Sequence, residues 1–142
     1  MDSDNIRELK EKGKYLSVPA GNSMEPLFHD KENVVEIVVP QKPVRPGDIV
    51  LFIREDGTSV IHRVVEEAAG GYYIRGDNCM EKEYVPSEKI AGICTRFYIK
   101  GRWVSVDDRR YRLYVALWGG LYPVRQLAWK LKKTVRGLIR SE

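Results

Sequence analysis

Ser23 is the residue whose type and surroundings could do chemistry. It lies in residues 21–26 (Gly-Asn-Ser-Met-Glu-Pro), and a serine hydroxyl becomes a nucleophile at neutral pH only when a neighbouring base takes its proton. The candidate base is His62, in an alternating apolar run that predicts a strand, and Asp77 could orient its imidazole. The three residues predict a serine hydrolase centre. The alternatives are a serine that only makes a turn and a histidine hydrogen-bonded in the core.

These residues fall on motifs that resemble those of the type I signal peptidases, in residues 21–26, 45–52, 60–65 and 73–78. The resemblance covers roughly residues 18 to 101. It is closest to the endoplasmic-reticulum and archaeal branch, in which the base is a histidine; the bacterial branch has a lysine at the position of His62. The resemblance implies a mostly β, signal-peptidase-like fold of coiled antiparallel sheets and hairpins, and the activity of a serine endopeptidase.

The resemblance also implies a mechanism and a substrate. Ser23 would attack the scissile carbonyl, His62 would carry the proton to the leaving amine, and Asp77 would bias the imidazole tautomer. The substrate would be an extended signal or leader peptide, or another precursor protein, laid along the strand segments before the catalytic residues. The expected binding residues are Pro19, Ala20, Gly21, Val60 and Ile61. No cofactor is implied.

The chain departs from the family pattern in two places. The family has a serine two residues before the nucleophile, where its hydroxyl helps to hold the oxyanion, and this chain has Gly21. The backbone N–H of Ser23, helped by the Asn22 amide, is therefore the expected donor, and loss of one such donor elsewhere costs about a hundredfold in rate. After the motif at residues 73–78 the histidine branch of the family carries two further aspartates, where this chain has Glu81 and Glu83.

The remaining reactive side chains are expected to take no part in catalysis. Cys79 and Cys94 could pair once at most, and we expect free thiols. Cys79 could serve as a nucleophile beside His62, but that alternative leaves Ser23 without a role. His29 is expected to be a solvated loop residue. No cysteine or histidine shows the spacing of a zinc site, so no metal is predicted.

The pattern of the first 108 residues predicts how these side chains are positioned. A short polar helix begins at Ser3 or Asp4 and ends at Lys12. An Asp-Gly turn at residues 56–57 predicts a hairpin that places His62 on its second strand. The predicted strands are residues 15–18, 33–39, 48–54, 59–66, 72–75, 90–100 and 102–106.

Charge divides the 142 residues into an acidic body and a basic tail. Residues 109–140 hold nine Lys or Arg and no acid, which leaves 15 basic and 20 acidic side chains elsewhere, a net charge of −5. We expect a catalytic domain at residues 1–108 and an amphipathic tail at 109–142. No cleavable signal sequence or run of about 20 apolar residues is present. The expected location is the cytoplasm, with peripheral attachment to the inner membrane face.

The tail carries a helical stripe of apolar residues with cations mostly on the opposite side. One interpretation is a helix packed on the β body, and another is an anchor that places residues 111–140 on an anionic membrane surface. The apolar residues 113–124 are too few to span a bilayer, because twelve residues of helix reach only about 18 Å. Nucleic acid is not a predicted partner, since no stacking or recognition motif accompanies the charge.

Two other functions remain open. The first is the related repressor-type self-cleaving domain, which uses a lysine base behind a DNA-binding domain. The roughly twenty residues before Ser23 leave no room for such a domain, and the base position is a histidine. The second is a non-catalytic peptide- or lipid-binding module that kept the peptidase fold, an alternative that Gly21 favours.

Overall fold

The computed structural model describes residues 2–140 and divides the chain into two compact units. We call Met1–Asp108 the β unit and Arg109–Glu142 the helical unit. The β unit contains α1 (Asp2–Lys12), β1 (Lys14–Ser17), β2 (Val34–Val38), β3 (Ile49–Ile53), β4 (Ser59–Ala68), β5 (Gly71–Arg75), β6 (Glu83–Pro86), the 3-10 helix η1 (Ser87–Lys89), β7 (Ile90–Ile99) and β8 (Arg102–Ser105).

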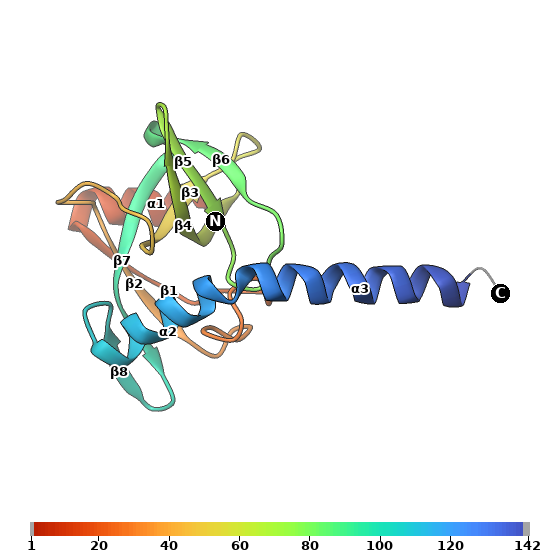
Figure 1. Ribbon diagram of the computed structural model, residues 1–142. Helices are drawn as coiled ribbons and strands as arrows, with labels where there is room; N and C mark the ends of the chain where they lie inside the picture. The colour runs from red at the N-terminus through yellow and green to blue at the C-terminus, as the bar shows by residue number, and fades with distance from the viewer. Residues whose placement is uncertain (1, 141–142) are drawn as a thin grey trace. The chain divides into compact units, whose positions relative to one another are not determined.

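The strands form one antiparallel sheet in the order β1-β2-β7-β3-β4-β5-β6, with β8 paired to β7 (Figure 1). The predicted mostly β fold is confirmed. Strand β6 and η1 were not predicted from the sequence, because Glu83–Pro86 is short and lacks the alternation of apolar residues that marks a half-buried strand. Among the described strands, β1 pairs only with β2 and so forms an edge of the sheet.

The hairpin of β3 and β4 delivers the histidine. Asp56 accepts hydrogen bonds from the Thr58 N–H at 2.9 Å and the Thr58 hydroxyl at 2.7 Å, which closes the predicted turn. The strands then pair in a register that sets Val50 opposite His62. Since strand side chains alternate between faces, this register fixes which face His62 occupies.

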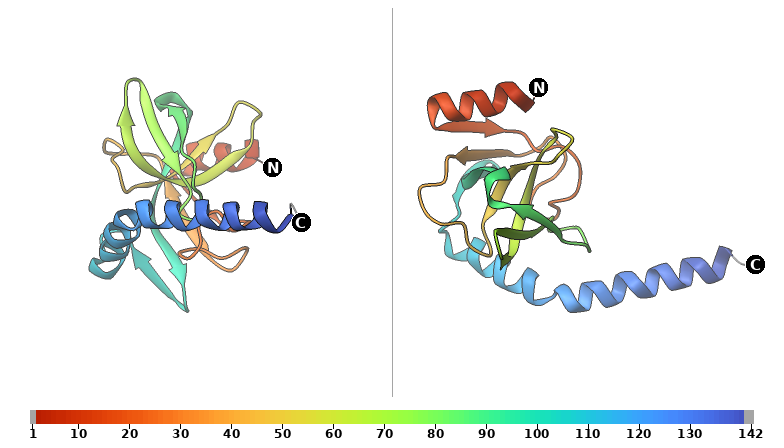
Figure 2. Two further views of the ribbon diagram at one scale, coloured as in Figure 1. Left: turned by 45° about the vertical axis from the view of Figure 1, so that its right-hand side comes forward. Right: turned by 90° about the horizontal axis from the view of Figure 1, so that it is seen from above.

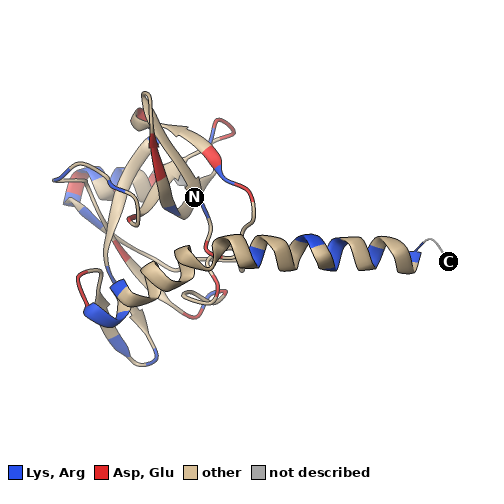
Figure 3. Cartoon of the chain, viewed as in Figure 1, with Lys and Arg blue, Asp and Glu red and all other residues tan. Residues whose placement is uncertain are grey.

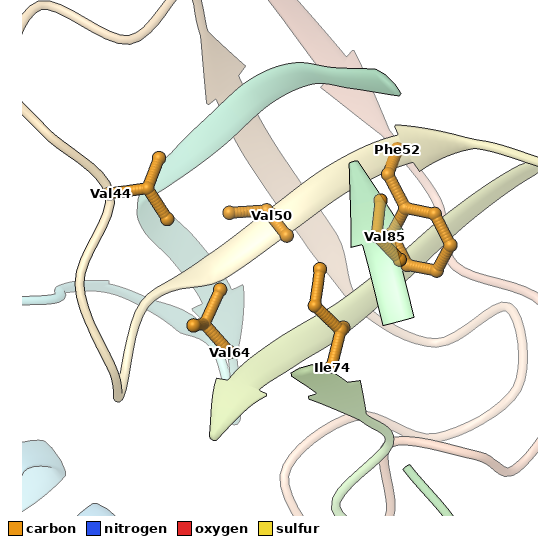
Figure 4. Close-up of a cluster of buried hydrophobic side chains, with 6 residues drawn as sticks. All are labelled: Val44, Val50, Phe52, Val64, Ile74 and Val85. Atoms are coloured by element: carbon orange, nitrogen blue, oxygen red, sulfur yellow. The ribbon is translucent and has the colours of Figure 1, made fainter. Parts of the chain in front are cut away.

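A core of β-strand side chains supports this hairpin (Figure 4). Its buried members are Val44, Val50, Phe52, Val64, Ile74 and Val85. Strands β3, β4 and β5 supply most of them, so the strand that carries His62 rests on close-packed side chains.

Helix α1 packs beside the other end of the sheet. Leu9, in α1, is 1% exposed, and a Cβ on Gly92 of β7 would lie 3.1 Å from its Cδ2 atom. Figure 2 shows α1 folded back along β1. A glycine in β7 thus makes room for the buried leucine that attaches the helix to the sheet.

The helical unit has two helices, α2 (Arg109–Gly120) and α3 (Tyr122–Arg140). They follow one another closely, because the N–H of Leu121 bonds to the carbonyl of Leu117 and the N–H of Arg125 bonds to the carbonyl of Leu121. No helix within residues 2–140 is long and apolar enough to cross a membrane.

Candidate active site

The structure brings the predicted nucleophile and base together. The Oγ atom of Ser23 lies 3.1 Å from Nε2 of His62, although the two residues are 39 apart in the chain. This distance suits a hydrogen bond in which the serine hydroxyl donates to a neutral imidazole. Ser23 lies in a turn and His62 within β4, so the more rigid element holds the base.

Asn78 fixes the turn that carries the nucleophile. Its backbone N–H donates to the carbonyl of Ser23 at 2.8 Å, and its side-chain amide donates to the carbonyl of Asn22 at 3.1 Å. On the other side, the carboxylate of Asp30 accepts the N–H of Gly21 at 2.6 Å. The turn is therefore tied at both ends, which limits the movement of the serine hydroxyl.

Gly76 allows the loop after β5 to approach the dyad. A Cβ at this buried position would lie 2.5 Å from the carbonyl oxygen of Ser23, 2.8 Å from Sγ of Cys79 and 3.1 Å from Nε2 of His62. No side chain fits in that space without moving the serine turn. Glycine at residue 76 is thus a requirement of the site geometry.

Asp77 does not make the contact with His62 that its motif predicts. Its carboxylate is held by the neighbouring residue of β4, Arg63, with Nε 2.7 Å from Oδ1 and Nη2 2.8 Å from Oδ2. Both side chains are buried, and Arg63 also donates to the carbonyl of Gly47 at 2.8 Å. A guanidinium offers a planar pair of donors that matches a carboxylate better than a single imidazole N–H does. Asp77 therefore fixes the strand next to the base rather than the base itself.

Burial sets the protonation of His62. The residue is 8% exposed, and its Nδ1 atom has no hydrogen-bond partner among residues 2–140. Loss of water around the ring lowers the pKa of His62, because desolvation disfavours the imidazolium. The carboxylates of Glu83 and Asp77 act in the opposite direction, and the Arg54 guanidinium adds to the lowering of this pKa. The imidazole is therefore neutral at neutral pH and able to accept a proton.

The dyad opens into a groove of about 780 Å³. One wall comes from β1 and the segment that follows it, and another comes from the start of β4. All five predicted binding residues line it: Pro19, Ala20, Gly21, Val60 and Ile61. Apolar side chains beyond that set also contribute, among them Ile6 of α1, Leu16 of β1 and Leu51 of β3. The lining is mostly apolar, with polar side chains such as Asn5 and Arg54 among it. A mostly apolar groove that reaches a hydroxyl and an imidazole suits an extended peptide chain.

Of the two residues expected to bind the oxyanion, Ser23 lines the groove and Asn22 lies directly before it in the chain. Asn22 is exposed, and its backbone carbonyl accepts hydrogen bonds from Glu25 and Asn78, which hold the residue in the turn. Its side-chain amide N–H groups are donors of the kind that an oxyanion needs. Gly21 has a φ of +86°, a left-handed conformation that a serine would adopt only with strain. The glycine that stands in place of the family serine therefore suits the local backbone conformation.

Of the other reactive side chains, Cys79 lines the groove, whereas Cys94 is buried and His29 is not among the lining residues. Cys79 and Cys94 are free thiols, as predicted. Burial raises the pKa of the Cys79 thiol, which lies 3.9 Å from the Ser23 carbonyl oxygen, and raises the pKa of Cys94 to about 12. Neither forms a thiolate readily. The His29 side chain is about half exposed and lies 3.5 Å from the Glu25 carboxylate.

No three His, Cys, Asp or Glu side chains in the described part of the chain are placed to hold a metal ion. Of the two glutamates that replace the family aspartates, Glu81 is exposed and Glu83 is paired with Arg54 at 2.7 Å. The Glu83 carboxylate thus acts on the dyad only through its charge.

Two residues of the site, Arg63 and Gly76, were not predicted from the sequence. Arg63 follows His62 directly, and Gly76 precedes Asp77 directly, so both fall inside the motifs. Their positions in those motifs were the available signal. What each contacts depends on the packing of β4 against the loop after β5, which no local pattern contains.

Comparison with known proteins assigns the β unit to a family. The family model described as Peptidase S24-like matches residues 5–104, a stretch that includes Ser23, His62 and Asp77. No curated protein matches the chain. The match supports the wider superfamily of signal-peptidase-like and repressor-type peptidases, a serine peptidase-type fold and serine peptidase activity in general. The chain belongs to the Peptidase S24-like family.

Proposed function

We propose that the chain is a serine endopeptidase of the Ser-His type that cleaves a signal or leader peptide. The observation that carries this proposal is the distance of 3.1 Å between Ser23 Oγ and His62 Nε2 in an apolar groove. A serine next to a neutral, buried imidazole can lose its proton as it attacks. A histidine base also favours the endoplasmic-reticulum and archaeal branch of the signal peptidases, since no lysine of the described chain lines the groove.

The substrate would lie between two segments of backbone. Residues 18–21 follow edge strand β1, and Ser59–Ile61 begin β4 on the other side of the groove. An extended peptide can hydrogen-bond to such segments through its main chain and place alternate side chains in the groove. The apolar lining favours small or apolar substrate side chains near the scissile bond.

The proposed reaction has two steps. His62 Nε2 takes the proton from the Ser23 hydroxyl as Oγ bonds to the scissile carbonyl carbon, and the same proton passes to the leaving amine when the C–N bond breaks. Water then attacks the acyl-enzyme, losing its proton to His62, and that proton returns to Ser23 Oγ as the peptide acid leaves. The Ser23 N–H and the Asn22 side chain would stabilise the oxyanion in both steps.

A serine-reactive fluorophosphonate probe tests the proposal. Ser23→Ala should abolish labelling, and His62→Gln should slow it by at least about a hundredfold, because the hydroxyl loses its base. Ser17→Ala is the matched control, since Ser17 also lines the groove but lies in β1, and it should label normally. Mass spectrometry should place the label on Ser23. Labelling of Ser23→Ala at the rate of the unchanged chain would refute the assignment.

The second candidate function is a non-catalytic module that binds peptides in the same groove. Gly21 favours it, because the chain lacks the family hydroxyl at the oxyanion. A library of extended peptides analysed by mass spectrometry separates the two functions. Cleavage products that depend on Ser23 support the peptidase, whereas peptides that bind equally to the unchanged chain and to Ser23→Ala, and are never cut, support the module.

The proposed place of action is the surface of an anionic membrane, where signal and leader peptides that carry apolar segments also partition. The helical unit supplies the attachment.

A further inference from the structure

Helix α3 separates its aliphatic side chains from its cationic ones, and Trp129 lies on the cationic side next to Lys133. At about 100° per residue, its aliphatic side chains fall within a sector of about 120°, and every cation falls outside that sector. The aliphatic residues are Val124, Leu127, Ala128, Leu131, Val135, Leu138 and Ile139. The cations are Arg125, Lys130, Lys132, Lys133, Arg136 and Arg140, and the helix contains no acidic residue (Figure 3).

The aliphatic sector is exposed. No residue of α3 is buried, and the large aliphatic side chains are between 52% exposed at Val135 and 70% exposed at Ile139. An apolar stripe of this length in contact with water is unfavourable, because each buried methylene group is worth roughly 0.8 kcal/mol of transfer free energy. The sector is therefore suited to a partner that covers it.

Charge decides which kind of partner can cover the aliphatic sector. A second copy of α3 would bring a like set of cations against the first, whereas helices that pair in water carry opposite charges beside their apolar seam. Nucleic acid would neutralise the cations but leave the aliphatic sector in water. A bilayer that contains anionic lipid satisfies both faces, since acyl chains cover the aliphatic sector and headgroups pair with the cations.

The junction of α2 and α3 adds aromatic groups suited to the headgroup region. The guanidinium of Arg125 lies 4.1 Å from the centre of the Trp118 ring, and its Nη2 atom donates to the Trp118 carbonyl at 3.3 Å. The rings of Tyr114 and Trp118 stack with their centres 6.2 Å apart. Trp and Tyr favour membrane interfaces because they combine an apolar ring with a polar atom.

We propose that α3 binds flat on the surface of a bilayer containing anionic lipid, with Leu131 near the centre of the inserted face. The helix does not cross the bilayer, in agreement with the lack of a spanning helix among residues 2–140. This inference concerns where the proposed peptidase acts, and it uses no catalytic residue. Membrane binding and probe labelling can therefore fail independently.

Flotation with lipid vesicles tests the proposal on the full chain. The chain should float with vesicles of phosphatidylcholine and phosphatidylglycerol, and much less with vesicles of phosphatidylcholine alone. Leu131→Gln should reduce binding by at least about tenfold, because it places an amide in the middle of the aliphatic sector. Gly137→Gln is the matched control: it introduces the same side chain on the cationic face, where a Cβ meets no atom within 4 Å, and should bind normally.

Charge variants test the electrostatic part. Replacing Lys132 and Lys133 by Gln should weaken binding to the anionic vesicles by about 25-fold at low salt, about fivefold for each cation, and leave the weak binding to neutral vesicles unchanged. Added salt should reduce the difference. Equal binding to both vesicle types, or binding unchanged by Leu131→Gln, would overturn the proposal.

Two further outcomes bear on the proposal. A dimer in sedimentation experiments that Leu131→Gln dissociates, without vesicle binding, would show that a second copy covers the sector and that the proposal is wrong. Probe labelling of Ser23 in Leu131→Gln at the normal rate, together with lost flotation, supports the proposal and shows that the β unit remains folded.

Discussion

The salt bridge between Arg63 and Asp77 is buried beside the catalytic base, and its removal should cost stability more than activity. The two side chains meet in two short contacts, at 2.7 and 2.8 Å, and have relative exposures of 9% and 3%. Asp77→Asn replaces one carboxylate oxygen by an amide nitrogen that cannot accept a hydrogen bond, and removes the negative charge that the Arg63 guanidinium faces. Breaking a buried pair in this way costs about 3 to 5 kcal/mol. In a unit of this size the midpoint of thermal unfolding should fall by more than about 10 °C.

The chain contains a matched exposed pair for comparison. Glu66 and Lys82 are also 2.8 Å apart, but their side chains are 56% and 46% exposed. Glu66→Gln should cost less than about 1 kcal/mol, because water screens and replaces that interaction. Adding Arg63→Gln to Asp77→Asn should recover part of the lost stability, since the buried positive charge is then removed as well.

Thermal unfolding followed by circular dichroism, together with the labelling rate of Ser23 below the unfolding temperature, separates the two roles of Asp77. The structure predicts a large loss of stability and a smaller loss of labelling rate in the protein that remains folded. If Asp77→Asn instead unfolds at the normal temperature and loses labelling by several orders of magnitude, Asp77 acts directly on His62, and the structural interpretation is wrong.

The other predictions concern the base His62, the close contact between Gly76 and Ser23, and the boundary between the β unit and the helical unit. Burial lowers the pKa of His62, so the base stays neutral to lower pH than a free histidine does. In a plot of cleavage rate against pH, the midpoint on the acid side should therefore lie below the free value of about 6.5. A midpoint above that value would contradict the burial argument. In Gly76→Ala, the Ser23 carbonyl oxygen must move from 2.5 Å to at least about 3.0 Å from the new Cβ, and the displaced serine should be labelled at least about tenfold more slowly. Gly119→Ala is the control: it has open space around it and should be labelled normally. A chain ending at Asp108 should fold and label Ser23; unfolding of that chain would show that the helical unit supplies part of its core.

The residue types and their order determined most of the secondary structure of this protein. Alternating apolar residues identify most strands, because a half-buried sheet demands a period of two, and the Asp-Gly turn identifies the hairpin that bears His62. The helical tail follows from its 3.6-residue period in the same way, although its division into α2 and α3 at Leu121 does not. Strand β6 escapes the pattern because its four residues, Glu83–Pro86, lack the alternation of apolar side chains.

The partners within the site depended on tertiary structure. Sequence motifs placed Asp77 near His62, but Arg63 projects from the next position of β4 and takes both carboxylate oxygens. That choice arises from the register of β4 with its neighbours and from the loop after β5, where Gly76 lets the backbone come close to Ser23. A short motif shows which residue types stand at which spacing, and from these the local backbone conformation can be predicted. Which side chains meet is decided by packing between segments distant in the chain, and this information resides only in the folded molecule.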